Sequence, residues 1–297
     1  MVSTVPALAH RLSRARAVDE FVLATVLLFL AVTAVRWLRD PGSVLCVADL
    51  DVAITVIGAF SGTVLTVLIL TPQGRRSGGH MNPAVTVSLW LMGAFPGRSV
   101  LPYVLAQLAG SAAGTGLARL VWGRPVTFPS VDYAAIGPAP TWQPASVFLA
   151  EVGGMAAIVL VVGFLLAHTR FSRLLPYAIG LSVALVIMLL GTRSGGSVNP
   201  ARQLGPAVLA GRTEDLWIYL VAPVLGAALG AWLDRLLGRL RRRLPSGATR
   251  VAASTDSSGE DGVATLAVQG RAALRVPTPR AVPTPSVQDV SVSDRKD

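Results

Sequence analysis

The sequence predicts an all-α membrane protein in which six transmembrane helices and two re-entrant half-helices form an inverted repeat. The first observation is composition: 52% of the 297 residues are hydrophobic and 14% are charged, against about 25% charged in soluble domains. The mean hydropathy is +0.59. The second observation is a set of apolar segments long enough to cross a bilayer, which takes about 20 residues. The third is a phrase that occurs twice, each time beside a shorter apolar segment.

The long apolar segments fall into two groups of three. A half-length apolar segment follows the second member of each group, so the two halves share one pattern. Three spans per half make the second half inverted relative to the first. The expected spans are 18–38, 52–70, 99–118, 146–167, 174–191 and 216–233, and the half-length segments are 85–95 and 204–209.

Composition divides the chain into an arm, a membrane domain and a tail. Residues 1–17 are a short basic arm, and the membrane domain covers residues 18–240. Within that domain, repeat one covers about residues 18–122 and repeat two about 145–238. Residues 245–297 are rich in Ser, Thr, Ala and Pro and cannot bury a core, which predicts a disordered tail.

The net charge of +10 is concentrated near the ends of the spans. Arginines precede the first span, flank the first short segment, lie between spans four and five, and follow span six. These positions share one side if the spans alternate, so the positive-inside rule places both termini in the cytoplasm. This placement argues against a nucleic acid partner. A signal peptide would also begin with basic residues, but no cleavage pattern of small residues follows the stretch 21–35, so we expect a retained first span.

The repeated phrase is Ser-Gly-Gly-x-x-Asn-Pro-Ala, at residues 77–84 and 194–201. Each copy has the features of a helix start, because Asn is a preferred N-cap and Pro is tolerated at the first helical position. An Asn-Pro pair alone would fit an ordinary capped helix. Its repetition beside short apolar segments, in corresponding positions of the two halves, predicts a site at the membrane midplane.

With these motifs and spans, the sequence resembles the aquaporin or major intrinsic protein family over about residues 19–237. The resemblance implies an aquaporin-like channel domain over residues 18–240. It implies a passive route for water and small uncharged solutes, closed to protons and ions, in a homotetramer of the plasma membrane. The motif residues expected to line the pore are Asn82, Pro83, Ala84, Asn199, Pro200 and Ala201.

The same alignment implies a selectivity filter. Arg202, three positions after the second Asn, matches the arginine of the family's constriction. A charge inside a membrane segment costs about 2.5–3.5 kcal/mol, which favours a functional reason for it. Ile187 and Gly196 match two further filter positions. The span-two position is Phe60 if the loop after that span contains an insertion, and Gly58 if the start of the span is matched instead; we prefer Phe60.

Three more residues are expected to support the half-helix loops. Glu20 and Glu151 lie in corresponding positions of the two halves. A buried carboxylate is costly unless its oxygens are satisfied, and the resemblance implies that both accept hydrogen bonds from loop amides. A simple charge at a helix end is the alternative for Glu20. His80, two positions before Asn82, is expected to shape its loop and to line the pore.

Markers of solute class are mixed. Ile187 stands where strict water channels carry a histidine, and Gly196 stands where a larger residue is common, so we expect a wider aperture that admits glycerol, urea or metalloid acids. Gln203 and Ala207 are more typical of water-selective channels, which keeps that alternative open. The segment 216–223 is similar to the plant nodulin-like branch, and the aquaglyceroporin branch is the other candidate.

Other function classes are less well supported by the sequence. It contains no nucleophile–base constellation, metal-spaced His or Cys cluster, or phosphate-binding loop, so we expect neither an enzyme nor a cofactor. An ion-coupled secondary transporter also uses inverted repeats and broken helices. Such a transporter needs titratable groups at the midplane, and the spans offer only Glu20 and Glu151, which have structural roles in this interpretation. The expected partners are water, small neutral solutes, the lipid bilayer and further copies of the chain.

Overall fold

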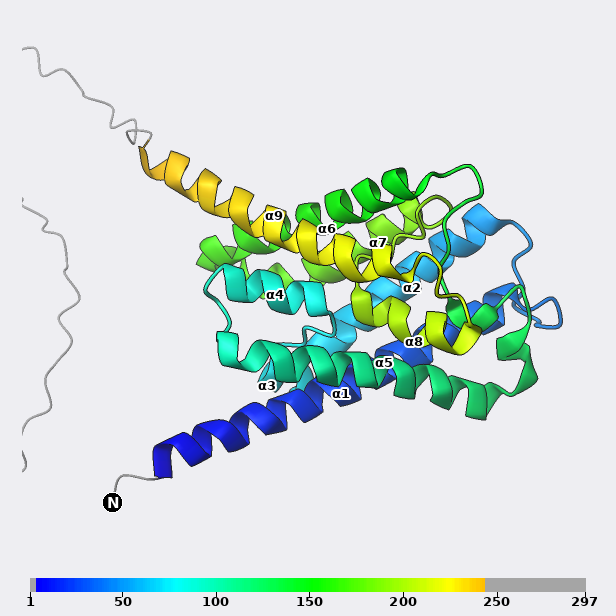
Figure 1. Cartoon of the computed structure of the whole chain (residues 1–297), viewed down its shortest axis with the longest axis horizontal. Coiled ribbons are helices and arrows are strands. Elements are labelled where there is room, and N and C mark those ends of the chain that lie inside the picture. The colour runs from blue at the N-terminus through cyan, green and yellow to red at the C-terminus, as the bar shows by residue number, and fades with distance from the viewer. Residues whose placement is uncertain (1–3, 244–297) are drawn as a thin grey trace, which may run out of the picture. The chain divides into compact units, whose positions relative to one another are not determined.

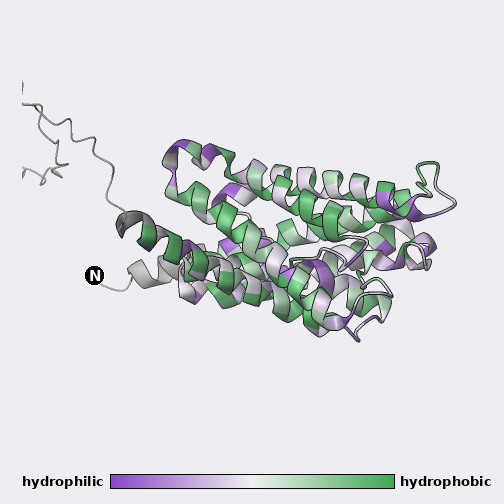
Figure 2. Ribbon diagram, turned by 90° about the horizontal axis from the view of Figure 1, so that it is seen from above, coloured by the Kyte–Doolittle hydropathy of each residue, from purple (hydrophilic) through white to green (hydrophobic). Residues whose placement is uncertain are grey.

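The computed structural model describes residues 4–243, and every regular element in that range is helical. Six helical segments in the described range are long and apolar enough to cross a membrane, and Figure 2 shows hydrophobic residues along much of their length. The predicted fold class is therefore confirmed. In chain order the elements are α1 (Thr4–Arg39), α2 (Leu50–Leu70), α3 (Pro72–Ser77), α4 (Pro83–Leu91), η1 (Gly97–Ser99), α5 (Val100–Trp122), η2 (Arg124–Thr127), η3 (Asp132–Ala134), α6 (Pro144–Ala167), η4 (Thr169–Leu174), α7 (Leu175–Leu190), α8 (Pro200–Ala210) and α9 (Leu216–Arg243).

The first helix is longer than the sequence predicted. It begins at Thr4 and runs without a break to Arg39, so the described part of the basic arm is helical and continuous with the first span. The predicted tail, residues 245–297, lies outside the described residues.

The spans pack in pairs that repeat between the two halves. Helix α1 packs on α5 in the first half and α6 on α9 in the second, while α2 packs on α7 across the halves. Glycines permit the close approaches: a Cβ at Gly114 would lie 2.2 Å from the carbonyl oxygen of Thr25, and one at Gly226 would lie 2.4 Å from that of Val152. Small residues at such contacts are typical of membrane helices, because lipid provides no hydrophobic drive for helix association.

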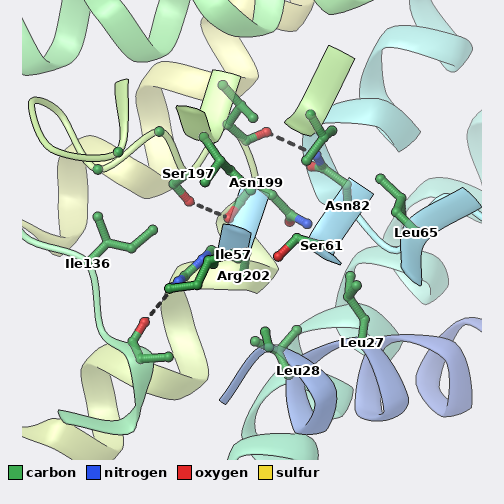
Figure 3. Close-up of a pocket in the computed structure, with 18 of the residues that line it drawn as sticks. Leu27, Leu28, Ile57, Ser61, Leu65, Asn82, Ile136, Ser197, Asn199 and Arg202 are labelled. Carbon is green, nitrogen blue, oxygen red and sulfur yellow. Dashed lines mark hydrogen bonds between the residues drawn. The ribbon is translucent and has the colours of Figure 1, made fainter. Parts of the chain in front are cut away.

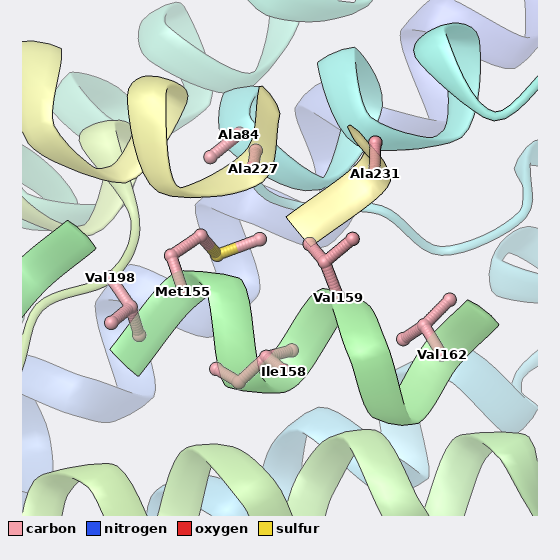
Figure 4. Packing of buried hydrophobic residues seen from close by; sticks show 8 residues of the cluster. All are labelled: Ala84, Met155, Ile158, Val159, Val162, Val198, Ala227 and Ala231. Atoms are coloured by element: carbon pink, nitrogen blue, oxygen red, sulfur yellow. The ribbon is translucent and has the colours of Figure 1, made fainter. Parts of the chain in front are cut away.

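The half-helices α4 and α8 join the two halves. Helix α4 packs mainly on α9 of the second half, and α8 mainly on α5 of the first. Figure 1 shows α4 and α8 roughly in line, with their near ends in the middle of the bundle. Ala84 of α4 belongs to a buried apolar cluster with Met155, Ile158, Val198 and Ala227, all from the second half (Figure 4).

Candidate functional site

The loops that precede α4 and α8 have nearly the same backbone. Gly78 and Gly195 have φ of 98° and 97°, and Met81 and Val198 have φ of 46° and 44°. Glycine takes positive φ without a steric penalty, but for a β-branched residue such as Val198 this conformation is an outlier. Strained backbone of this kind persists only where its surroundings hold it in place.

The carboxylate of Glu20 holds the first loop. Its Oε1 accepts hydrogen bonds from Ser77 Oγ at 2.6 Å and from the backbone amide of His80 at 3.0 Å. Its Oε2 accepts from the amide of Met81 and from Gln107 Nε2, both at 2.7 Å. The side chain is fully buried, so these four donors offset the cost of removing a carboxylate from water.

Glu151 does the same for the second loop. Its Oε1 accepts from Ser194 Oγ at 2.9 Å and from the amide of Ser197 at 3.1 Å, and its Oε2 accepts from the amide of Val198 at 2.6 Å. The last bond fixes the residue with the strained backbone. Both carboxylates thus stand where the sequence analysis expected loop support.

A matched pair of tyrosines, not predicted from the sequence, also holds the loops. The hydroxyl of Tyr103 donates to the carbonyl oxygen of Ser77 at 2.8 Å, and that of Tyr219 donates to the carbonyl oxygen of Ser194 at 2.6 Å. Both side chains are buried. The repeat could have indicated this pair, because Tyr103 follows Ser77 and Tyr219 follows Ser194 by nearly the same number of positions.

Asn82 and Asn199 cap the half-helices, as the motif predicts. Asn82 Oδ1 accepts a hydrogen bond from the amide of Ala84 at 2.8 Å, and Asn199 Oδ1 accepts one from the amide of Ala201 at 2.9 Å. Both asparagines have extended backbone, and a proline follows each at the start of the helix. The side-chain oxygens are therefore committed to the helix starts.

The side-chain amide nitrogens of Asn82 and Asn199 each donate a hydrogen bond to the loop of the opposite repeat. Asn82 Nδ2 donates to the carbonyl oxygen of Val198 at 2.9 Å, and Asn199 Nδ2 donates to that of Met81 at 3.0 Å. These bonds place the N-termini of α4 and α8 against each other. A side-chain amide carries two N–H donors, so each asparagine keeps one donor beyond its bond to the opposite loop.

His80, two positions before Asn82, contributes to the wall of the cavity. Its Nδ1 is 3.1 Å from Thr86 Oγ1, and its ring makes tilted or edge contacts with Phe95 and Tyr103. These contacts fix the ring. They agree with the expected part in shaping the loop.

A cavity of about 350 Å³ runs past both asparagines and has residues from either side of them in its wall. On one side the lining includes the charged side chains of Arg202, Asp132 and Arg212 beside aliphatic residues such as Ile57 and Ile187. On the other side it is mostly aliphatic. Figure 3 shows Asn82, Asn199 and Arg202 grouped around this space. The aliphatic part of the wall includes Leu27, Leu65, Val85, Leu89, Val162 and Ile179.

Arg202 is fixed by the connection between the two halves. Its Nη1 donates to the carbonyl oxygen of Ala134, in the 3₁₀ turn η3, at 2.8 Å. The next residue, Gln203, donates from Nε2 to the carbonyl oxygen of Ile136 at 2.7 Å and accepts from the amide of Ile136 at 3.3 Å. Gln203 therefore anchors the connection. The sequence offered no local signal for either contact, because the partners lie about 70 positions apart.

The expected filter residue of span two, Phe60, was wrong. Phe60 is 39% exposed and does not belong to the cavity wall. Gly58 faces α7, since a Cβ there would lie 3.0 Å from the carbonyl oxygen of Ala184. The α2 residues that line the cavity at this level are Ile57 and Ser61. The alignment missed them because it could not fix the rotation of the helix about its axis.

Gly196 does not widen the aperture, although we expected this from its missing side chain. Gly196 lines the cavity, but a Cβ at this position would lie 2.9 Å from the carbonyl oxygen of Val186 and 3.3 Å from the Cα of Ile187. The missing side chain therefore makes room for α7 and does not widen the cavity. Ile187 itself does line the cavity, as expected.

Together these groups create a definite chemical environment. The N-terminus of a helix carries a partial positive charge, and two such ends meet at the asparagines, with Arg202 on one side. The cavity wall offers hydrogen-bond donors at its centre and aliphatic carbon beyond it. A neutral molecule with an acceptor oxygen fits this environment, whereas a cation would lose hydration without compensation.

Comparisons with known proteins agree with this geometry. The model of the family described as "Major intrinsic protein" matches residues 8–234. The chain is 35% identical over 182 residues to "Probable aquaporin NIP7-1" of Arabidopsis thaliana, covering 61% of this chain and 64% of the relative. It is 38% identical over 177 residues to "Nodulin-26" of Glycine max, covering 59% and 63%. The matched regions span less than two thirds of these relatives' lengths.

A solved structure supports the fold. The aquaglyceroporin from Plasmodium falciparum superimposes with a TM-score of 0.67 at 21% identity, covering 77% of this chain and 98% of that one. At this identity the likeness shows a shared fold.

Proposed function

Because the chain belongs to the major intrinsic protein family, we propose that it is a passive transmembrane channel for water and small uncharged solutes that excludes protons and ions. The chain is a multi-pass membrane protein by its six apolar helices and its family. The observation that carries the proposal is the meeting of two half-helix N-termini at Asn82 and Asn199 inside a cavity that extends to both sides of them.

The filter in this proposal consists of Arg202, Ile187, Ile57 and the backbone of Gly196, all of which line the same cavity. Arg202 supplies a fixed positive charge and hydrogen-bond donors. The two isoleucines supply an apolar wall. A charge and an apolar surface in one constriction suit a molecule with a carbon edge and a hydroxyl or amide edge.

The solutes proposed are glycerol, urea and undissociated metalloid acids. The apolar pair Ile57 and Ile187 supports this class, because neither adds a hydrogen-bonding side chain that would favour water alone. The fold shared with a protein named an aquaglyceroporin is compatible with it. A water-selective channel is the alternative. Replacing Ile187 with His adds a polar ring to the filter and should lower glycerol and urea flux relative to water flux.

The carboxylates support a passive channel over an ion-coupled transporter. Both oxygens of Glu20 and of Glu151 accept hydrogen bonds from the half-helix loops. A coupling site needs a carboxylate that can exchange protons or ions during transport, and these two are engaged in holding the fold. We also propose that the chain has no enzymatic activity.

The setting proposed for the channel is a homotetramer in the plasma membrane, with both termini in the cytoplasm. The arginine-rich segments on one side of the spans support this orientation. Chemical cross-linking in intact membranes tests the oligomer. Protease access to tags at each end, in sealed cells and after permeabilisation, tests the orientation.

The decisive experiment for the activity is stopped-flow light scattering on proteoliposomes containing the purified chain. Water, glycerol and urea permeabilities are measured with and without a proton or sodium gradient. The proposal requires water flux above that of empty liposomes, independent of either gradient. Gradient-dependent accumulation of a solute would support the transporter, and an absence of all flux in folded protein would overturn the proposal.

A further inference from the structure

The end of the cavity that contains Arg202 is strongly cationic. Its wall includes two further arginines, Arg39 at the end of α1 and Arg212 just beyond α8. Among the described residues, Asp132 is the one carboxylate in the cavity wall, so three positive charges face a single negative charge. A concave site lined mainly by one sign of charge concentrates ions of the opposite sign. We call these four residues the cationic mouth.

The three arginines converge on the turn η3. Arg202 donates a hydrogen bond to the carbonyl oxygen of Ala134 at 2.8 Å, and Arg212 forms an ion pair with Asp132 at the start of the same turn. Helix α1 packs against η3 as well, and its last residue is Arg39. The turn therefore brings together charges that lie far apart in the sequence.

Most donors of the two outer guanidinium groups are unused in the described part of the chain. Within residues 4–243, Arg39 engages only Nη1, which donates to the carbonyl oxygens of Val47 at 2.7 Å and Ala48 at 3.2 Å. Arg212 contacts Asp132 through Nε, and 59% of its side chain is exposed. An arginine presents five N–H donors, and its planar fork matches the two oxygens of a carboxylate. The remaining nitrogens can therefore bind a small carboxylate from solution.

An anion that enters this mouth is held there. The N-termini of α4 and α8 and the side chain of Arg202 repel cations, but their positive charge attracts anions. Beyond the asparagines the wall is mostly aliphatic, and aliphatic carbon cannot replace the hydration shell of a charge. An anion therefore has an attractive site at the mouth and no favourable path through the other half of the cavity.

We propose that the cationic mouth binds small soluble carboxylates, above all dicarboxylates, and that a bound carboxylate blocks the path of water and neutral solutes. Two negative charges match the net charge of the site. Arg39 and Arg212 carry the binding, whereas Asp132 opposes it, because its carboxylate repels the ligand and competes for Arg212. Binding itself does not depend on the proposed function, but the block of flux rests on it.

The probe for this site is malonate, a small dicarboxylate. Calorimetric titration of the purified protein in detergent measures binding, and stopped-flow water permeability of proteoliposomes measures block. Malonate is present on both faces of the membrane, so that channels in either orientation meet it, and sodium chloride at equal ionic strength is the reference. We expect malonate to bind and to lower water permeability in a saturable manner.

Four variants separate the charge of the site from the stability of the turn. Arg39→Gln and Arg212→Gln should each weaken malonate binding about two- to fivefold, the effect of removing one charge from a partly exposed pair. Asp132→Asn should strengthen binding by a similar factor, although it breaks the same ion pair as Arg212→Gln. Arg124→Gln is the matched control and should bind malonate as the wild type does, because Arg124 is exposed and lies outside the cavity wall.

Opposite effects of Arg212→Gln and Asp132→Asn would support an anion site, because damage to the turn would move both variants in one direction. Weaker binding in both would overturn the proposal, and so would wild-type protein that binds no malonate. Binding without a loss of water flux would overturn the block. Wild-type protein that conducts no water in chloride would overturn the proposed function, while the titration would still test the carboxylate site.

Discussion

The side-chain amide of Asn82 donates a hydrogen bond to the carbonyl oxygen of Val198, 2.9 Å away in the other half of the chain. Asn199 returns the bond to Met81. Each carbonyl that receives such a bond belongs to a residue with left-handed backbone. The asparagines therefore cap their own helices and also hold the strained loop of the opposite repeat.

Replacing Asn82 with Ala should destabilise the fold as well as the pore. The substitution removes an N-cap, which is worth about 0.5–2 kcal/mol, and leaves the buried carbonyl of Val198 unpaired, which costs about 1–3 kcal/mol. Asn199→Ala should cost a similar amount, because its bonds mirror those of Asn82. Unfolding of the purified variants in mixed detergent measures both values. A large difference between the two variants would contradict the mirrored roles.

The two buried glutamates should differ in importance. Glu20 accepts four hydrogen bonds, including one from Gln107, while Glu151 accepts three. A glutamine amide presents donors where one carboxylate oxygen accepted, and each bond to a charged group is worth about 1.5–3 kcal/mol. Glu20→Gln should therefore lower the free energy of unfolding more than Glu151→Gln does. Equal losses would show that the bond from Gln107 adds little.

Hydropathy predicted the spans, but it could not predict which face of each span looks inward. Helix α2 is apolar on all sides, so Phe60 and Ile57 are equivalent by composition. Only the packing of α2 against α7, at Gly58 and Gly62, turns Ile57 and Ser61 toward the cavity. A sequence pattern cannot supply that rotation when lipid-facing and protein-facing residues are equally hydrophobic.

The site was predictable where the repeat made it visible. Asn82 and Asn199 stand in duplicated motifs, and Glu20 and Glu151 stand in matching contexts. The partner of Arg202 has no such signal, because Ala134 lies in an irregular connection that occurs once in the chain. Contacts of this kind depend on where a long loop folds back, and local sequence does not determine that.

The contact between α2 and α7 should tolerate no added carbon at Gly62. A Cβ there would lie 2.4 Å from the carbonyl oxygen of Gly180 and 2.8 Å from the Cβ of Ala184. Gly62→Ala should therefore destabilise the protein by about 1–3 kcal/mol, the usual cost of overpacking. Gly116→Ala is the matched control, since a Cβ at Gly116 has no neighbour within 4 Å. The control should be neutral or stabilising by up to about 1 kcal/mol; similar losses in both variants would argue against the clash.

Arg202→Val should weaken ion exclusion. The substitution removes a fixed positive charge from the cavity wall and the hydrogen bond to Ala134. We expect water flux to be kept or raised while proton or cation leakage increases, because a fixed positive barrier is lost. Fluorescence of a trapped pH indicator and stopped-flow water permeability measure the two effects on one preparation. Wild-type selectivity in folded Arg202→Val protein would remove Arg202 from the proposed filter.

An ion pair between Asp132 and Arg212 should position the carbonyl group that holds Arg202. The two side chains are in contact, and Asp132, Tyr133 and Ala134 have φ of 44°, 54° and 59°. Such left-handed conformations cost roughly 1–2 kcal/mol per residue, so the turn needs an external restraint. The ion pair provides one next to Ala134.

Asp132→Asn isolates that restraint, because Asn tolerates left-handed backbone as well as Asp does and only the charge is removed. We expect proton or cation leakage to rise in the same direction as in Arg202→Val, but by a smaller factor, about two- to fivefold, since a pair this open to solvent is worth about 1 kcal/mol or less. Arg212→Gln should produce the same increase. The double variant should leak no more than either single one, because both remove the same contact. Additive leakage, or none, would mean that the pair does not control Arg202.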